Sequence, residues 1–400
     1  MRKHHFAWLL AAGSTTLALV ACGGNEPNYG TPATVDPGFI PGAGIAPPRF
    51  AYVANFTSNN VSGYTVNPTD GKLTNMGLSW ATGNGPVSIA TDPLVKFAYV
   101  ANSDDDNISV FSIADPSGVL TAVAGAPIAA GDRPMSVAVD PQGRYVYVAN
   151  AGDNTVSAYV RDTSSGLMNG VTGSPFSAGG TEPTSVTVDP SGKFVYVANF
   201  VSNTIAIFSI DSASSASHTP GALTSVGVIA TDAAPTSITI GVVEGASTKS
   251  YVAYVANFGN DRVTAYGVNT TTGALTLLGA VAASPNTSPT SVAAEPNGKF
   301  VYVSHLQQST VSTYKVTQTG SSTGALTLQA AAGATLPATT YPYSVAADPS
   351  GKFIYTVHSS DGKVSAYQIA SGTGALTAIT GSPFDAEAGT SGAKFILITK

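Results

Sequence analysis

The chain has 400 residues, which is longer than one hydrophobic core usually supports unless the protein is built from repeats or a large β architecture. Charged residues make up only 10% of it, against roughly 25% in an average soluble protein, while 42 glycines and 25 prolines supply many turn formers. This composition favours an all-β protein with many loops. The formal net charge of −6 argues against nucleic acid as a partner and against binding to anionic lipid surfaces by charge.

The first 21 residues predict a secretory signal peptide. Arg2 and Lys3 are followed by an uncharged apolar stretch at 6–20, and small residues precede Cys22. The stretch is short for a membrane span, which needs roughly 20 apolar residues.

Cys22 is the only cysteine of the chain, so no intrachain disulfide can form. The residues Leu-Val-Ala-Cys-Gly around it resemble the bacterial lipobox, in which the cysteine is lipidated and becomes the first residue of the mature protein. This resemblance implies a lipoprotein anchored in membrane lipid through Cys22. Gly23, where some bacteria use Asp as an inner-membrane retention signal, favours the outer membrane, on its periplasmic or surface side. Residues 22–48 are rich in Pro and Gly and are expected to form a disordered linker.

A repeat of about 48 residues runs through the rest of the chain, 49–400. The segment Phe-Ala-Tyr-Val-Ala-Asn at 50–55 returns unchanged at 97–102. Related segments end at Asn150, Asn199, Asn257, His305 and His358. The repeat therefore has seven copies.

Each full copy contains four strand-like runs, which is typical of a β-propeller blade. In the fourth copy, the turn 189–193 (Asp-Pro-Ser-Gly-Lys) joins the first run to Phe194–Asn199. That second run is apolar on both faces, as expected for a strand that neighbouring blades cover on both sides. We predict a seven-bladed β-propeller of four-stranded blades over residues 49–400.

The two ends of the repeat region predict how the ring closes. The first copy lacks the Pro-x-Ser-Val strand that precedes the later copies, and an apolar run at 394–399 remains after the seventh. We expect this C-terminal run to supply the missing innermost strand of the first blade, which would remove open strand edges.

The recurring words Tyr-Val-Ala-Asn, Gly-Ala-Leu-Thr, Gly-Ser-Pro-Phe and Asp-Pro-Ser-Gly-Lys resemble the YVTN-type propellers and the seven-bladed lactonase family that includes 6-phosphogluconolactonase. The resemblance covers residues 50–400. It implies a His, Arg and Glu set at one face of the propeller, with histidine at the opening of an inner strand and Asn-Glu-Leu at the end of a second strand. Here these positions read Arg133-Pro-Met-Ser136 and Ser304-His305-Leu306, so no family catalytic residue carries over by position.

In propellers, ligand sites usually lie where the loops between blades and the loops between second and third strands surround the channel. We call this face the mouth. Its candidate catalytic residues here are His305, His358, Arg133 and Glu182, and its candidate ligand-binding residues are Arg262, Tyr341, Asn150, Asn199 and Asn257. Histidine can act as a general base near neutral pH, and arginine can bind a carboxylate or phosphate with two hydrogen bonds.

Structural roles are the alternative for several of these residues. His305 and His358 stand where five copies have Asn, so they can equally cap strand ends. The loop 102–107 (Asn-Ser-Asp-Asp-Asp-Asn) offers oxygen ligands for calcium but can equally be a solvated acidic loop. Acidic residues recur between first and second strands at Asp92, Asp140, Asp189, Glu295 and Asp348, and we assign them to turn formation. We predict no metal site and no cofactor.

The sequence therefore predicts a monomeric envelope lipoprotein whose propeller binds an unidentified small molecule or protein at the mouth. The alternatives are a lactone hydrolase acting on a sugar lactone, and a purely structural envelope protein. In the hydrolase, His305 or His358 would activate water and Arg133 or Arg262 would hold the anionic group of the substrate.

Overall fold

The computed structural model describes residues 49–212, 219–244, 249–282, 287–329, 333–336, 340–385 and 392–400. The signal peptide, Cys22 and the linker predicted for residues 1–48 lie outside the described residues. Within the described ranges, helix is limited to a single 3-10 turn, η1 (Phe258–Asn260), and no helix has the length and apolar character needed to cross a bilayer.

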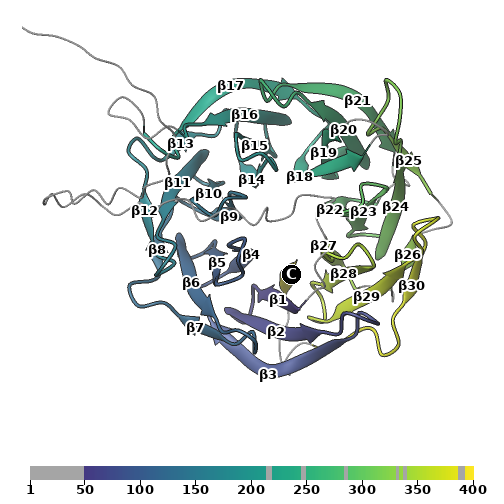
Figure 1. Ribbon diagram of the computed structural model, residues 1–400, viewed down its shortest axis with the longest axis horizontal. Helices are drawn as coiled ribbons and strands as arrows, with labels where there is room; N and C mark the ends of the chain where they lie inside the picture. The colour runs from purple at the N-terminus through teal and green to yellow at the C-terminus, as the bar shows by residue number, and fades with distance from the viewer. Residues whose placement is uncertain are drawn as a thin grey trace, which may run out of the picture. The chain divides into compact units, whose positions relative to one another are not determined.

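The described chain folds into seven antiparallel sheets arranged as the blades of a propeller around a common axis, as predicted (Figure 1). Each blade has four main strands, counted outward from the channel. The innermost strands of blades 1 to 7 are β31 (Ala393–Ile398), β4 (Pro86–Thr91), β9 (Pro134–Val139), β14 (Pro183–Val188), β18 (Pro235–Glu244), β22 (Pro289–Ala294) and β27 (Pro342–Ala347).

The outer strands follow the same order. The second strands are β1 (Phe50–Asn55), β5 (Phe97–Asn102), β10 (Tyr145–Asn150), β15 (Phe194–Asn199), β19 (Lys249–Asn257), β23 (Phe300–His305) and β28 (Phe353–His358). The third strands are β2 (Asn60–Val66), β6 (Asn107–Ile113), β11 (Thr155–Arg161), β16 (Thr204–Ile210), β20 (Arg262–Val268), β24 (Thr310–Val316) and β29 (Val364–Ile369). The fourth strands are β3 (Leu73–Ala81), β7 (Leu120–Ala122), β12 (Met168–Gly170), β17 (Leu223–Ala230), β21 (Leu275–Ala282), β25 (Leu326–Leu328) and β30 (Leu376–Ala378). Three short strands, β8 (Ile128–Ala129), β13 (Phe176–Ser177) and β26 (Ala334–Thr335), pair with the third strands of blades 2, 3 and 6.

The hydrophobic core lies between blades. Every residue of β5 is buried, and the side chains of a second strand alternate between two neighbours. In β1, Phe50, Tyr52 and Ala54 pack in the cluster shared with blade 2, whereas Ala51 and Val53 pack in the cluster shared with blade 7. This explains why the repeated strand segment is apolar on both faces.

A serine of the inner strand links neighbouring blades by hydrogen bonds. Ser136 Oγ accepts from Val186 N at 3.1 Å, and Ser185 Oγ accepts from Ile238 N at 3.2 Å. An N–H group of the next blade's inner strand donates the same bond to the Oγ atoms of Ser88, Ser237, Ser291 and Ser344. These bonds explain the serine of the recurrent Pro-x-Ser-Val words. In β31 the equivalent position is Phe395, opposite Ala54 of β1, so the joint between blades 1 and 2 lacks this serine.

A tyrosine of the second strand makes a second link. Tyr196 Oη donates to the carbonyl of Gly273, in the turn between the third and fourth strands of the next blade, at 2.9 Å. Tyr52, Tyr99, Tyr147, Tyr302 and Tyr355 do the same. The glycines adopt φ near +70 to +87°, and at Gly118 a Cβ would lie 2.5 Å from the Phe50 ring, so glycine is required there by both conformation and space.

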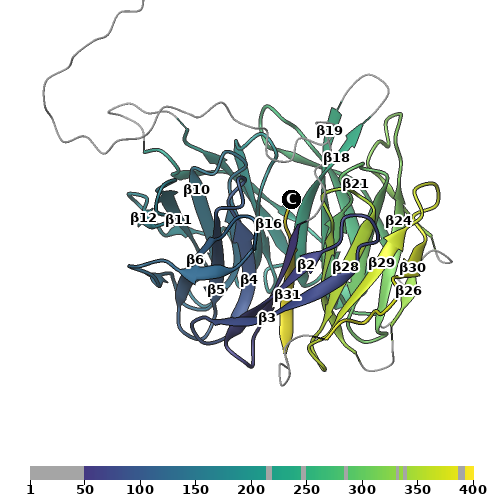
Figure 2. The ribbon, with the colours of Figure 1, turned by 60° about the horizontal axis from the view of Figure 1, so that its bottom comes forward.

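The ring closes as predicted. β31 pairs antiparallel with β1, with Tyr52 opposite Leu397 and Val53 opposite Ile396, so the C-terminal strand is the innermost strand of blade 1, next to β1 (Figure 2). Ile396 and Ile398 are buried in the cluster between blades 7 and 1.

Deleting residues 392–400 should lower the melting temperature by at least roughly 10 °C, because it exposes β1 and one side of two inter-blade clusters to water. Thermal unfolding followed by circular dichroism measures this. A deletion variant that melts like the full chain would contradict the closure.

The tyrosine link predicts a matched pair of variants. Tyr196→Phe should destabilise the protein by about 1 kcal/mol, because the buried Gly273 carbonyl loses its donor. Tyr254→Phe should change stability by less than about half of that, because the Tyr254 hydroxyl has no hydrogen-bond partner among the described residues. Urea unfolding of both variants gives the comparison, and equal losses would argue against the link.

Candidate functional site

The mouth is built by the residues that stand directly before each inner strand, which begins with proline in blades 2 to 7 and with Ala393 in blade 1. The residue at this position has a positive φ in all seven blades. The seven residues are Gly85, Arg133, Glu182, Ala234, Ser288, Tyr341 and Gly392. In five blades the loop between the second and third strands of the preceding blade supplies a side-chain oxygen to this residue's N–H, as when Asp106 accepts from Arg133 N at 2.8 Å. The other four bonds run to Asn59, Asn154, Asn203 and Asp261. Inter-blade loops and second-to-third strand loops therefore share one face, as expected.

Arg133 and Glu182, both predicted as catalytic, meet at this face. They come from the neighbouring blades 3 and 4 and form an ion pair. Their side chains remain 47% and 32% exposed, so solvent or a ligand can reach both. The guanidinium of such a pair can bind an anionic group, and the carboxylate can accept a proton from water.

A second pair lies in blade 5. Arg262 Nη1 lies 3.9 Å from Asp232 Oδ1. Asp232 is also held by Thr264 Oγ1 at 2.7 Å and by Asn260 Nδ2 at 2.8 Å. Arg262 is thus a second exposed cation at the mouth. Tyr341, 43% exposed, stands at the start of blade 7.

The asparagines predicted to bind ligand are fully buried at the ends of their strands. Asn150 Nδ2 donates to Thr155 Oγ1 and Ser157 Oγ at 3.0 and 2.9 Å, and Asn257 Nδ2 donates to Thr264 Oγ1 at 3.0 Å. Asn199 Nδ2 donates to the Ala178 carbonyl and to Thr204 Oγ1. These bonds hold the loop between the second and third strands. A role in ligand binding stays a prediction.

His358 occupies the asparagine position of blade 7 and makes equivalent bonds. Its Nε2 lies 2.8 Å from Ser365 Oγ, seven residues on, as Asn150 lies from Ser157. Its Nδ1 lies 3.2 Å from Asp361 Oδ1. The ring is fully buried; burial lowers the pKa of His358, and the nearby Asp361 charge opposes that shift.

His305 occupies the same position in blade 6 but differs from its counterparts. It is fully buried, and neither ring nitrogen has a hydrogen-bond partner among the described residues. Burial lowers the pKa of His305 to about 4, against an opposing contribution from Asp261. The imidazole is therefore neutral at physiological pH, and its side chain is shielded from solvent. A catalytic role for either histidine stays a prediction.

The acidic loop 102–107 is hydrogen-bonded to the inter-blade loops on both sides of blade 2. Asp105 accepts from Asn84 N and Asn84 Nδ2, each at 2.8 Å, and Asp106 accepts from Arg133 N. In the described ranges no group of three or more His, Cys, Asp or Glu side chains is arranged to hold a metal ion.

The opposite end of the channel contains a cavity that the sequence analysis missed. Its volume is about 390 Å³, and it lies where the inner strands end. Apolar side chains and a proline from most blades line it, among them Val139, Pro141, Val188, Pro190 and Ile240. The signal was present in the recurrent Asp-Pro turns, which place a proline at the same point of successive blades.

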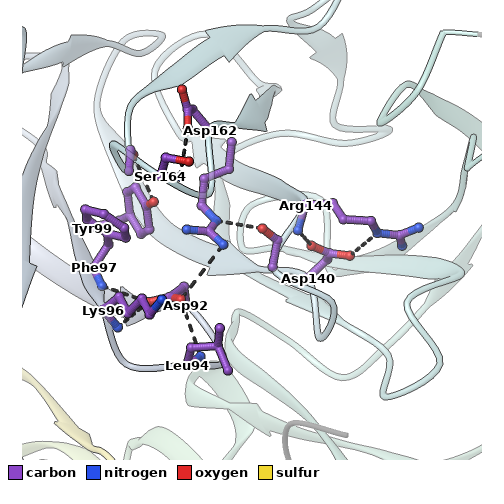
Figure 3. A network of polar contacts seen from close by, with 12 residues as sticks. Asp92, Leu94, Lys96, Phe97, Tyr99, Asp140, Arg144, Asp162 and Ser164 are labelled. Carbon is purple, nitrogen blue, oxygen red and sulfur yellow. Dashed lines mark hydrogen bonds and ion pairs between the residues drawn. The ribbon is translucent and has the colours of Figure 1, made fainter. Parts of the chain in front are cut away.

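The acidic residues at this end form turns, as assigned. Asp92 Oδ1 accepts from the N–H groups of Lys96 and Phe97, each at 2.7 Å (Figure 3). Asp140, Asp189 and Asp348 make the same pair of bonds. At Glu295, desolvation by burial raises the pKa to about 7, although the N–H of Lys299 opposes this shift.

A few buried charges stabilise this end. Arg161 Nη2 lies 3.8 Å from Asp92 Oδ2, and Arg161 Nε donates to the Gly143 carbonyl at 2.6 Å. Arg144 is held against Asp140 at 3.0 Å, as Figure 3 shows. The carboxylates of Asp92 and Asp140 are therefore bonded to backbone N–H groups and to arginine.

The fold is that of a seven-bladed β-propeller. The sequence model described as "Lactonase, 7-bladed beta-propeller" matches residues 45–137, 127–228 and 241–391. The chain belongs to this lactonase family. No protein of curated function matches it significantly.

Solved structures show the same fold at low sequence identity. A putative 6-phosphogluconolactonase from Bacteroides fragilis is 18% identical, with a TM-score of 0.73, and the match covers 90% of this chain and 99% of that one. A second putative 6-phosphogluconolactonase, from Bacteroides uniformis, is 18% identical, with a TM-score of 0.72 and coverage of 88% and 100%. The periplasmic gluconolactonase of Pseudomonas aeruginosa is 15% identical, with a TM-score of 0.71 and coverage of 88% and 99%.

The buried imidazole of His305 predicts a pH dependence of stability. Its folded pKa of about 4 lies below the ordinary value of 6.5, so the unfolded chain binds the proton first and stability falls as the pH drops from about 6.5 towards 4. His305→Asn should remove on the order of 2 kcal/mol of the loss between pH 7.5 and 5. Urea unfolding at both pH values measures it, and an identical loss in the variant would contradict the assignment.

Proposed function

We propose that the protein hydrolyses the ring ester of a sugar lactone at the mouth. The observation that carries the proposal is the lactonase-family match over most of the propeller. It is supported by neighbours described as 6-phosphogluconolactonases and a gluconolactonase, and by the accessible Arg133–Glu182 pair.

The proposed chemistry needs only water and the two paired side chains. Glu182 accepts a proton as a water oxygen attacks the lactone carbonyl, and the resulting tetrahedral intermediate collapses by breaking the ring C–O bond. The proton then passes to the departing alkoxide, so the product is the open hydroxy acid and Glu182 is regenerated. Arg133 holds the carbonyl oxygen or an anionic group of the substrate through its remaining N–H donors.

The activity predicts a contrast between two glutamates. Glu182→Gln should reduce the enzymatic hydrolysis of glucono-δ-lactone or 6-phosphogluconolactone by at least about a hundredfold, because general base catalysis contributes that much or more. Glu244→Gln is the matched control, since Glu244 also forms an exposed ion pair, with Lys249 at 3.2 Å, at the far end of blade 5. The rate is followed by acid release, with the spontaneous reaction subtracted.

The histidines are tested in the same assay. His305→Asn and His358→Asn introduce the residue that five other blades have at this position, so folding should be retained. Activity that survives both changes assigns acid–base chemistry to Glu182, whereas activity lost in a folded variant assigns it to that histidine. If the unaltered protein hydrolyses neither substrate, the hydrolase proposal is wrong and a module that binds its ligand without turnover becomes the better proposal.

The proposal places this activity on an envelope lipoprotein. Its support is the sequence of residues 1–22 and the similarity to a gluconolactonase described as periplasmic. Cells grown with labelled palmitate should label the protein, and Cys22→Ser should abolish the label because the thiol is the attachment atom. Persistence of the label in the variant, or recovery of the unaltered protein in the cytosol, would contradict the proposed anchor.

A further inference from the structure

A pocket of about 710 Å³ lies between blades 5 and 6, away from the mouth. It is lined by the first residues of β19, by the end of β20 with the turn that follows it, and by the turn after β24. Lys249, where β19 begins, and Asn257, where it ends at the mouth, lie at opposite ends of a nine-residue strand. The pocket is therefore separate from the proposed lactonase site.

Both blades depart from the repeat at this point. In the other six blades an aromatic residue starts the repeated segment of the second strand, and its ring packs on the glycine of the next blade's turn, as Phe300 does on Gly374. In blade 5 the equivalent residue is Val252, which faces Gly324 and lines the pocket. At the wall of this pocket, blade 5 thus has a smaller side chain, buried to 1% exposure, where the other blades have a ring.

Two further departures from the repeat lie at the same pocket. The β18–β19 hairpin extends the pairing to Glu244 and Lys249, with strands of ten and nine residues instead of six. The turn of blade 6 closes with a hydrogen bond from Gly324 N to the Thr317 carbonyl, whereas the corresponding bond of blade 7 runs from Gly374 N only to Ala370. The substitution at Val252, the longer hairpin and the longer turn therefore all lie at the interface between blades 5 and 6, where the pocket is.

The pocket is lined by hydroxyl and amide groups and carries little net charge. Ser250, Thr270, Ser321 and Thr323 supply hydroxyls. No carboxylate lines the pocket, and the one charged lining residue, Lys249, is neutralised by Glu244 at 3.2 Å. Such a lining favours a neutral ligand that can both donate and accept hydrogen bonds.

Two lining amides have fixed orientations that suit hydroxyl groups. Gln318 Nε2 donates to the carbonyls of Gly298 and Val316, at 2.9 and 3.0 Å, which leaves its Oε1 as an acceptor. Asn269 Oδ1 accepts from the N–H groups of Thr271 and Thr272, at 2.9 and 3.0 Å, which leaves its Nδ2 as a donor. A sugar hydroxyl can satisfy both.

We propose that this pocket binds a neutral saccharide. Its volume lies within the roughly 300–1,000 Å³ of small-molecule sites, and its separation from the mouth makes it a second site, independent of any lactone hydrolysis.

The test is saturation-transfer NMR on the full chain with millimolar maltose, cellobiose, N,N′-diacetylchitobiose and, as the charged comparison, glucuronic acid. We expect saturation transfer from the protein to at least one of the three neutral disaccharides. Gln318→Ala should weaken its binding by about fivefold to tenfold, the value of one hydrogen bond. Gln329→Ala, on the same blade but outside the pocket lining, is the matched control and should bind as the unaltered chain does.

A filling variant makes the test independent of single hydrogen bonds. Val252→Phe restores the aromatic residue of the other blades and should abolish binding without lowering the melting temperature. Transfer only to glucuronic acid, transfer to none of the probes, or binding retained in a folded Val252→Phe variant would each overturn the proposal. Lactone hydrolysis should be unchanged in Val252→Phe, so failure here is distinguishable from failure of the proposed activity.

Discussion

Burial between neighbouring blades is the interaction on which the rest of this structure depends. A second strand such as β1 divides its side chains between two clusters, so neither face of a blade is shielded by the blade itself. Removing one sheet would expose two clusters to water. Pairing of β31 with β1 is therefore more than an end-to-end contact, because it completes the inner edge of blade 1 and lets every sheet have two neighbours.

Directional bonds add geometry to this burial. Inner-strand serines and second-strand tyrosines bond across the joints between blades, one near the channel and the other farther out. Two bonds at different radii fix the angle between adjacent sheets better than apolar packing alone, since hydrogen bonds are directional. The joint from blade 5 to blade 6 retains the serine bond of Ser237, whereas Tyr254 has no partner among the described residues. The outer part of this joint is where the pocket opens.

The repeat predicted the fold well because one pattern of strands and turns recurs seven times. In each copy the second strand is apolar on both faces, which indicates burial between two neighbours. The sequence predicted the ring closure because a strand was missing at one end and left over at the other. It placed Arg133 and Glu182 at one face but did not predict their pairing, because the two lie in different copies of the repeat. Likewise, the strand-end position of His305 followed from the repeat, but its lack of partners depends on surroundings that only the fold assembles. The pocket beside Val252 was missed because it arises where two blades depart from the repeat together.

The left-handed residues at the mouth have a consequence for how such a protein can change. Their backbone is held by the loop of the preceding blade, as Asp106 holds Arg133 N and Asn154 holds Glu182 N. The position directly before the inner strand is occupied in this one chain by glycine, alanine, serine, tyrosine, arginine and glutamate. The main chain thus tolerates very different side chains around the same opening, and a new specificity can be acquired by single replacements that leave the ring of sheets untouched.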